Sequence, residues 1–202
     1  MAIHDEFDLK AATWDDDPAK VARAQRVAGL IRDHVRLDEQ MNVLEYGAGT
    51  GLVSEALVGH VGHITVSDRS AGMLEVLRAK AEAGRLGNAD VADLDLATSS
   101  DLNTTFDLIV SVMVMHHIPE VNNVLTQLRT IISADGYACI ADLDAEDGSF
   151  HGAGFAGHNG FDRAQFASDL RRAGFNTVEF LDAGTVTKDS GEFGLFLAIA
   201  QP

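Results

Sequence analysis

A glycine-rich turn near the start of the chain has the spacing needed to hold a nucleotide-like ligand. Its pattern is Glu45-x-Gly47-x-Gly49-x-Gly51, directly after the apolar residues Val43 and Leu44. Such turns bring backbone N–H groups close to a ligand, but a dinucleotide turn has the spacing G-x-G-x-x-G. Leu52 occupies the place of that third glycine, and the Gly-Lys-Ser/Thr ending of a Walker loop is absent. The turn therefore favours a ligand without a pyrophosphate, and Glu45 could accept from a cationic amine on it.

Two carboxylates follow the next two predicted strands. Asp68 ends "ITVSD", 19 residues after Gly49, and Asp93 lies in "VADLD". A carboxylate at the position of Asp68 can accept both hydroxyls of a ribose. Asp93 could accept from an adenine amino group, with Asp90 as the alternative because strand boundaries are uncertain by a few residues. A ligand with an amine, a ribose and an adenine, but no phosphate, is S-adenosylmethionine.

Four stretches of the chain, "VLEYGAGTG", "VSDRSAGMLEVLRAK", "VADLDL" and "FDLIVSVMVMHHI", resemble successive motifs of class I S-adenosylmethionine-dependent methyltransferases. The similarity is to the small-molecule branch that includes ubiquinone- and menaquinone-biosynthesis-type enzymes, and it covers roughly residues 43–144. The resemblance implies S-adenosylmethionine as cofactor, with Met73 lining the adenine pocket. The cofactor-binding residues that it implies are Glu45, Gly47, Ala48, Gly49, Gly51, Asp68, Arg69, Met73, Asp93, Leu94, Ser111 and Val112.

Strands and helices are predicted to alternate along the chain, which is typical of a parallel sheet with helices on both faces. The last two strands, 175–182 and 192–200, have no helix between them, and their short connection favours an antiparallel hairpin. We therefore predict an α/β, Rossmann-like three-layer sandwich. Its mostly parallel sheet has about seven strands, with one antiparallel strand near the edge. Residues 1–202 are predicted to form a single methyltransferase domain, with 1–36 as an N-terminal helical cap and 147–162 as a substrate-side loop.

Two segments could cover the acceptor at the strand ends. The first is the N-terminus, with Phe7 and Trp14, and the second is the loop 147–162, which contains five glycines. In this loop, His151 or His158 could deprotonate an acceptor near neutral pH. The alternative is a flexible connection with surface histidines. The candidate residues for the acceptor and its lid are Phe7, Trp14, His116, Phe150 and Phe155.

Histidines and acids elsewhere leave further options open. Of His116 and His117, one is expected to face the cofactor pocket and the other to pack or cap. An oxygen-rich metal site could be built from Asp142, Asp144, Glu146 and His151, but acidic loops are common in such an acidic chain. No metal is therefore assigned, and the single Cys139 rules out a metal–thiolate centre.

Composition limits the partners of the chain. The net charge of −16 disfavours nucleic acid and anionic membranes as partners. We expect a cytoplasmic monomer or homodimer that methylates a small-molecule acceptor on oxygen, nitrogen or carbon. The sequence does not identify the acceptor. The alternative function is a non-catalytic S-adenosylmethionine-binding regulatory or interaction protein.

Overall fold

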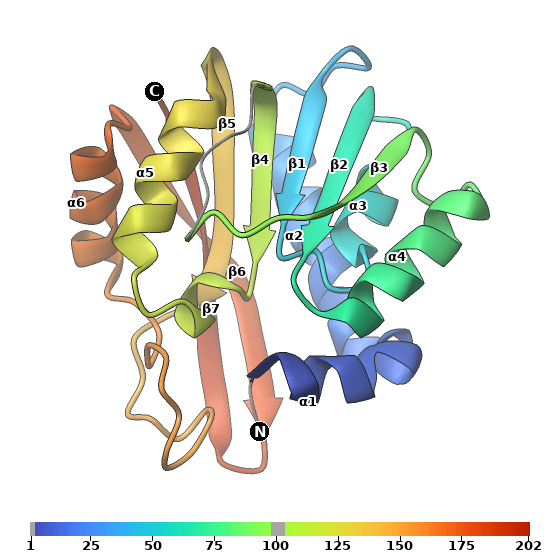
Figure 1. Cartoon of the computed structure of the whole chain (residues 1–202). Coiled ribbons are helices and arrows are strands. Elements are labelled where there is room, and N and C mark those ends of the chain that lie inside the picture. Colours follow the sequence, from blue (N-terminus) through green and yellow to red (C-terminus); the bar gives the residue numbers. More distant parts are fainter. Residues whose placement is uncertain (1–2, 98–103) are drawn as a thin grey trace. The chain divides into compact units, whose positions relative to one another are not determined.

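The computed structural model describes residues 3–97 and 104–202 (Figure 1). Its chain divides into two compact units. The first unit comprises Met1–Asp95 and Phe106–Val110, and the second comprises Leu96–Thr105 and Ser111–Pro202. Residues 1–2 of the predicted N-terminal cap lie outside the described residues. No described helix has the length and apolar character needed to cross a membrane.

The first unit carries the parallel strands and the helices between them. It begins with α1 (Ile3–Lys10), the 3-10 helix η1 (Ala11–Asp16) and α2 (Pro18–His34). Strand β1 (Asn42–Tyr46) is followed by α3 (Leu52–Leu57), β2 (His63–Asp68), α4 (Ala71–Glu82) and β3 (Ala89–Asp93). Strand β4 (Phe106–Val112) begins in this unit, and β1 pairs in parallel with both β2 and β4. The parallel pairing places the carboxyl ends of β1, β2 and β3 at the same edge.

Helix boundaries follow the capping residues that the sequence provides. The side chain of Asp17 accepts a hydrogen bond from the amide of Ala19, next to Pro18 in the first turn of α2. Ser70 caps α4 in the same way by accepting from the amide of Met73. An N-cap of this kind satisfies backbone N–H groups that have no partner within the helix. The cap of α4 matters for function because it fixes the turn that begins at Asp68.

The second unit carries the antiparallel strands. Its elements are η2 (Met115–His117), α5 (Val121–Ile131), β5 (Ile132–Leu143), α6 (Arg163–Ala173), β6 (Thr177–Lys188) and β7 (Gly191–Gln201). Strand β7 pairs antiparallel with both β5 and β6. Cys139 lies in β5 and is fully buried, which raises the pKa of its thiol, so it is a core residue and not a reactive one.

The strand order of the sheet is β3-β2-β1-β4-β5-β7-β6. This confirms the predicted α/β fold with seven strands, mostly parallel, and one antiparallel strand next to the edge. The hairpin differs from the prediction, because β6 and β7 continue through most of the expected connection at 183–191. A register shift between Asp182 and Gly184 absorbs the irregularity. The β-branched residues Thr185, Val186 and Thr187 then continue the strand, as their side chains favour.

Candidate functional site

The glycine turn after β1 adopts a backbone that only glycine takes readily. Gly47, Gly49 and Gly51 all have positive φ, at 71°, 58° and 79°. A Cβ atom on Gly51 would lie 2.8 Å from Cδ2 of Leu77, so this glycine also lets the turn pack against α4. The turn is therefore fixed in shape and free of side chains at the three positions where the sequence predicted a ligand.

Asp68 is tied directly to this turn. Its Oδ2 accepts from the amide of Gly49 at 2.7 Å. Its Oδ1 accepts from the amides of Arg69, at 2.8 Å, and Ser70, at 2.9 Å. Three backbone donors thus hold the carboxylate at the junction of β2 and α4. The structure brings together the glycine turn and the acid that the sequence predicted to act with it.

The second predicted acid stands beside the first. Asp68 and Asp93 are register partners at the carboxyl ends of β2 and β3. Asp93 is exposed, and Leu94 after it is buried. Asp90 lies three residues earlier in β3 and pairs with His63 at 3.2 Å, so it does not stand at the strand end. Asp93 thus stands at the strand end and Asp90 does not, and the role of Asp93 toward the adenine stays a prediction.

Glu45 is a buried acid at the other side of the turn. Its Oε2 accepts from the amide of Ser54, at 3.0 Å, and from the hydroxyl of the same serine. The pKa of Glu45 is raised to about 7, mainly because the carboxyl group is buried. The hydrogen bonds from Ser54 lower this pKa, and the charge of Asp68 raises it. Glu45 therefore holds its proton up to near-neutral pH.

The predicted N-terminal cap contacts these elements within the first unit. Oδ1 of Asp8 accepts from the hydroxyl of Ser70, at 2.5 Å, and from the amide of Gly72, at 3.0 Å. The indole Nε1 of Trp14 lies 4.0 Å from the position of a Cβ on Gly49. The ring of Phe7 lies edge-on to Trp14, with 5.9 Å between the centroids. Phe7 and Trp14, predicted to cover the acceptor, thus lie against the glycine turn and the start of α4.

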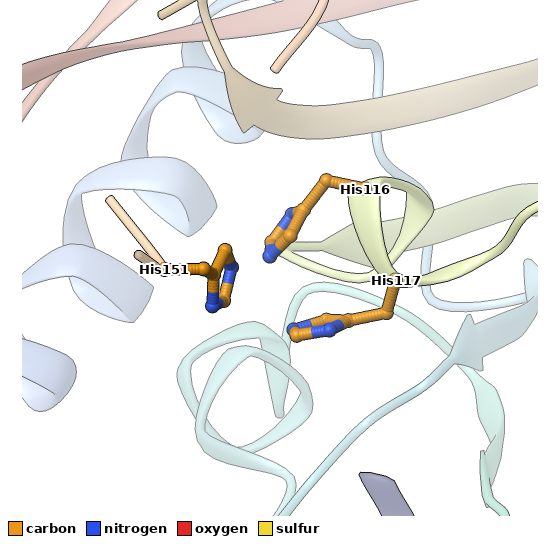
Figure 2. Close-up of side chains that lie close together, drawn as sticks. All are labelled: His116, His117 and His151. Atoms are coloured by element: carbon orange, nitrogen blue, oxygen red, sulfur yellow. The ribbon is translucent and has the colours of Figure 1, made fainter. Parts of the chain in front are cut away.

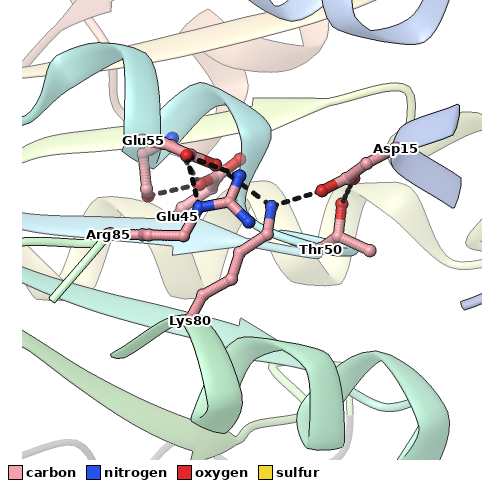
Figure 3. A network of polar contacts seen from close by, with 7 residues as sticks. Asp15, Glu45, Thr50, Glu55, Lys80 and Arg85 are labelled. Atoms are coloured by element: carbon pink, nitrogen blue, oxygen red, sulfur yellow. Dashed lines mark hydrogen bonds and ion pairs between the residues drawn. The ribbon is translucent and has the colours of Figure 1, made fainter. Parts of the chain in front are cut away.

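A network of charged side chains holds this segment in place (Figure 3). Asp15 accepts from the hydroxyl of Thr50 at 2.5 Å and lies 2.6 Å from Nζ of Lys80. Lys80 also donates to Glu55 at 3.1 Å, and Glu55 pairs with Arg85 at 2.8 Å. The Lys80 side chain is only 5% exposed, so the two carboxylates compensate a charge that water scarcely reaches.

The other predicted cofactor residues are divided between the two units. The amide of Ala48 donates to the carbonyl of Ser67 at 2.8 Å. Arg69 pairs with Asp95 at 2.6 Å, and Met73 is buried in the core. Ser111 and Val112 are the last two residues of β4 and belong to the second unit, where Ser111 is fully buried.

The second unit contains a buried histidine–aspartate pair. Nδ1 of His116 lies 2.5 Å from Oδ1 of Asp142, and the two side chains are 1% and 0% exposed. The backbone amide of His116 donates to the other oxygen of the same carboxylate at 3.2 Å. Since Asp142 stands near the end of β5 and His116 follows β4, the pair lies where two neighbouring strands end. The carboxylate fixes the orientation of the imidazole.

Two further imidazoles complete a cluster around this pair (Figure 2). The ring centroid of His116 lies 4.1 Å from that of His117 and 5.1 Å from that of His151. His151 also stacks on Phe155, with 3.8 Å between the centroids. The pKa of His117 is lowered to about 3, first because the imidazole is buried and second because of the neighbouring His116 and His151. His117 is therefore neutral at physiological pH.

The loop 147–162 is folded onto this cluster by backbone contacts. The amide of His158 donates to the carbonyl of His116 at 2.7 Å, and a Cβ on Gly157 would lie 2.1 Å from the same oxygen. Nε2 of His158 lies 3.0 Å from the carbonyl of Ile118, so this imidazole anchors the loop. Phe150 is buried, and the loop lines an open pocket of about 520 Å³ that includes Phe155. The two histidines predicted as alternative bases therefore have different surroundings.

The acids considered for an oxygen-rich metal site are engaged separately. Asp144 forms two hydrogen bonds with Arg163, at 2.6 and 2.7 Å. Glu146 accepts from the amides of the loop residues Gly148 and Phe150. Among the described residues, the group that could hold a metal ion is instead His116, His117 and His151. The structure thus places His151 with the two histidines after β4 and not with these acids.

Several site residues were not singled out from the sequence. Asp8, Asp15 and Lys80 join the N-terminal segment to the glycine turn, but they are ordinary charged residues in helical patterns. Met113, directly after β4, has a φ of 59° that is uncommon for a residue with a side chain. The position of Asp142 at the end of a strand next to β4 was the one available signal for its pairing with His116.

Comparisons with known proteins agree with this geometry. Residues 20–180 match a family described as a methyltransferase domain. An uncharacterized methyltransferase of Schizosaccharomyces pombe is 26% identical over 185 residues, covering 84% of this chain and 61% of the relative. A ubiquinone biosynthesis O-methyltransferase of Glaesserella parasuis is 26% identical over 69% of this chain and 63% of its own length. The chain thus spans about three fifths of each relative.

A solved structure shows the same fold over nearly the whole chain. It is the structure described as "Complex between the Haloferax volcanii Trm112 methyltransferase activator and the putative methyltransferase". The TM-score is 0.77 at 18% identity, and the match covers 97% of both chains.

Proposed function

This chain belongs to the class I S-adenosylmethionine-dependent methyltransferases, and from that premise we propose that it methylates a small-molecule acceptor. The observation that carries the proposal is the position of Asp68. Its carboxylate is bonded to the glycine turn through Gly49 and stands beside Asp93 at the ends of adjacent strands. Two carboxylates next to a turn without side chains suit a ribose and an adenine, and they would repel a pyrophosphate.

We assign each part of S-adenosylmethionine to residues of the first unit. We propose that Asp68 accepts from the ribose hydroxyls and that Asp93, with the backbone at Leu94, binds the adenine. The turn at Gly47–Gly51 then lies against the methionine part. When bound, the cofactor supplies an electrophilic methyl carbon on a sulfonium. The protein holds it in place and orients it for in-line attack.

Glu45 suits the amine end of the same ligand. In the absence of a bound cation, its carboxyl group is neutral below about pH 7, because burial disfavours the charged form. A bound ammonium group would favour the charged form and form a charge-assisted hydrogen bond with it. We propose this role for Glu45 although its Oε2 accepts from the amide and the hydroxyl of Ser54 in the free chain.

The second unit supplies the residues proposed for the acceptor. In open α/β sheets, ligands bind at the carboxyl ends of strands, where β4 leads to His116 and β5 ends at Asp142. The rings of Phe150 and Phe155 each lie with their centroid 6.2 Å from that of His116 and add apolar surface beside it. Of the two loop histidines, we assign the role toward the acceptor to His151, because Nε2 of His158 is bonded to backbone carbonyls.

A small-molecule acceptor is supported by two independent features. The net charge of −16 is unfavourable for a nucleic-acid substrate. The similarity to ubiquinone biosynthesis O-methyltransferases supports an acceptor that is methylated on oxygen. Whether the chain acts in the cytoplasm, and as a monomer or a homodimer, stays a prediction that cell fractionation and light scattering can check.

Product formation tests the proposal directly. The purified chain is incubated with S-adenosylmethionine and a panel of phenolic, amine and carbon acceptors, and S-adenosylhomocysteine is measured. We expect acceptor-dependent product with the wild type and a strong reduction with Asp68→Asn. Binding of the cofactor without turnover across a broad panel would favour the non-catalytic regulatory alternative. If the cofactor does not bind, both the catalytic function and the regulatory alternative are contradicted.

A further inference from the structure

We propose that His116, His117 and His151 form a binding site for one divalent transition-metal ion of the Zn²⁺ type. The three side chains point toward one another in Figure 2. One ring nitrogen from each can be chosen so that all three lie within 4.8 Å of one another. Two of the histidines come from η2 and the third from the loop 147–162, so the fold brings together ligands that are 34 residues apart in the chain.

The spacing of the nitrogens is close to that of a metal centre. Zn–N bonds of about 2.0–2.1 Å in a tetrahedral site place the nitrogens about 3.4 Å apart. The nitrogens therefore need to approach one another by at most about 1.4 Å, which is within reach of rotation about the side-chain bonds. His151 precedes Gly152, whose surroundings leave open space, so the loop can accommodate the adjustment.

The surroundings of His116 are those of a metal ligand. Its Nδ1 is bonded to the buried carboxylate of Asp142, which leaves Nε2 facing the cluster. Within the described part of the chain, this Nε2 is buried and has no hydrogen-bond partner. A buried polar atom without a partner is costly, so such atoms call for an explanation. Ligating histidines commonly bond their other nitrogen to a carboxylate, which fixes the tautomer and raises the basicity of the ligand.

Charge also favours a cation at this position. The carboxyl group of Asp142 is fully buried and lies one imidazole away from the proposed ion. The nearby cation Lys188 lies over the ring of Phe150 and donates to its backbone carbonyl. Aromatic stacking alone would account for the ring contacts, but not for the buried Nε2 of His116.

Three histidine ligands leave a fourth position open, as in catalytic zinc sites. An ion held there binds an oxygen of the acceptor and lowers the pKa of its hydroxyl group. The site then selects acceptors with an oxygen ligand, such as a phenol, and His151 acts through the ion and not as a free base. This role rests on the proposed function, whereas binding of the ion does not.

Metal binding is tested without cofactor or acceptor. Tag-free protein is treated with a chelator and dialysed, and Co²⁺ and Zn²⁺ are titrated with visible absorption and calorimetry as readouts. We expect one ion per chain and the intense absorption of four-coordinate Co²⁺. His117→Ala and His151→Ala should each weaken Zn²⁺ binding by about 100-fold or more, since each removes a ligand, and Asp142→Asn by about 10–100-fold.

The control is His60→Ala, which removes an exposed histidine of the first unit. It should leave affinity and stoichiometry unchanged. Circular dichroism and thermal unfolding confirm that each variant is folded. Failure of the wild type to bind, or unchanged binding in both folded histidine variants, would overturn the proposal.

Binding of S-adenosylhomocysteine to the metal-free protein is measured in parallel. Metal binding without binding of this ligand contradicts the proposed function alone. Ligand binding without metal binding contradicts the metal site alone.

Discussion

The buried carboxyl group of Glu45 makes the stability of the fold depend on pH in a way that one substitution should remove. The variant is Glu45→Gln, which keeps the shape of the side chain and an oxygen that can accept from the amide of Ser54. The charge is lost, and with it the cost of ionising a group that water scarcely reaches. The exposed Glu75 provides the matched control, Glu75→Gln.

The size of the effect follows from the pKa. Burial raises it from 4.5 in the unfolded chain to about 7 in the folded one. Between these values the folded state keeps a proton that the unfolded state has released, so stability falls as the pH rises through this window. At 1.36 kcal/mol per pH unit, the free energy of unfolding falls by about 3 kcal/mol, and the fall is complete above pH 7.

Urea unfolding at pH 5 and pH 8, followed by circular dichroism, measures the effect. We expect the free energy of unfolding of the wild type to fall by about 3 kcal/mol between the two pH values, reduced by the part that is already lost at pH 5. Glu45→Gln should not show this fall. Glu75→Gln should show the same fall as the wild type. An equal difference between wild type and Glu45→Gln at both pH values would refute the assignment of a raised pKa to this group.

Three further substitutions test other parts of the account. Asp68→Asn should weaken binding of S-adenosylhomocysteine by roughly ten- to several-hundred-fold in calorimetry, because charge-assisted hydrogen bonds contribute about 1.5–3 kcal/mol each; unchanged affinity in the folded variant would remove Asp68 from the site. His151→Ala should lower the single-turnover rate of methyl transfer by about 10²–10⁴-fold with unchanged cofactor affinity, and an equal effect of His158→Ala would contradict the distinction between them. Lys80→Met should lower the free energy of unfolding in urea by about 1.5–3 kcal/mol, because its ion pair with Asp15 is lost. An unchanged free energy of unfolding would show that the network in Figure 3 does not stabilise the fold.

Local patterns predicted the elements that hold the cofactor-side residues. Asp17 and Ser70 begin helices because their side chains satisfy nearby backbone amides, which a short stretch of sequence reveals. The glycine turn and Asp68 were predicted to meet because parallel strands end at the same edge, and the hydrogen bond from Gly49 confirms that they do. These features need no knowledge of distant contacts.

Contacts between distant segments were not predictable in the same way. His116 and Asp142 are 26 residues apart, and their pairing depends on the neighbouring positions of β4 and β5. Asp15 reaches Lys80 only because the N-terminal segment folds back onto α4. The hairpin was predicted with its strands ending at Asp182 and beginning again at Glu192, whereas the structure continues the pairing beyond a register shift at Gly184. In each case tertiary packing decides what the local pattern leaves open.

Calorimetry with S-adenosylmethionine, S-adenosylhomocysteine and NAD, each titrated into the wild-type chain, tests the central claim most directly. The contacts of Asp68 and the positive φ angles of the glycine turn predict that both sulfur ligands bind at one site per chain. They also predict that NAD does not bind, because its pyrophosphate would meet Glu45, Asp68 and a turn with Leu52 in place of a third glycine. Tight binding of NAD with no response to either sulfur ligand would contradict the account.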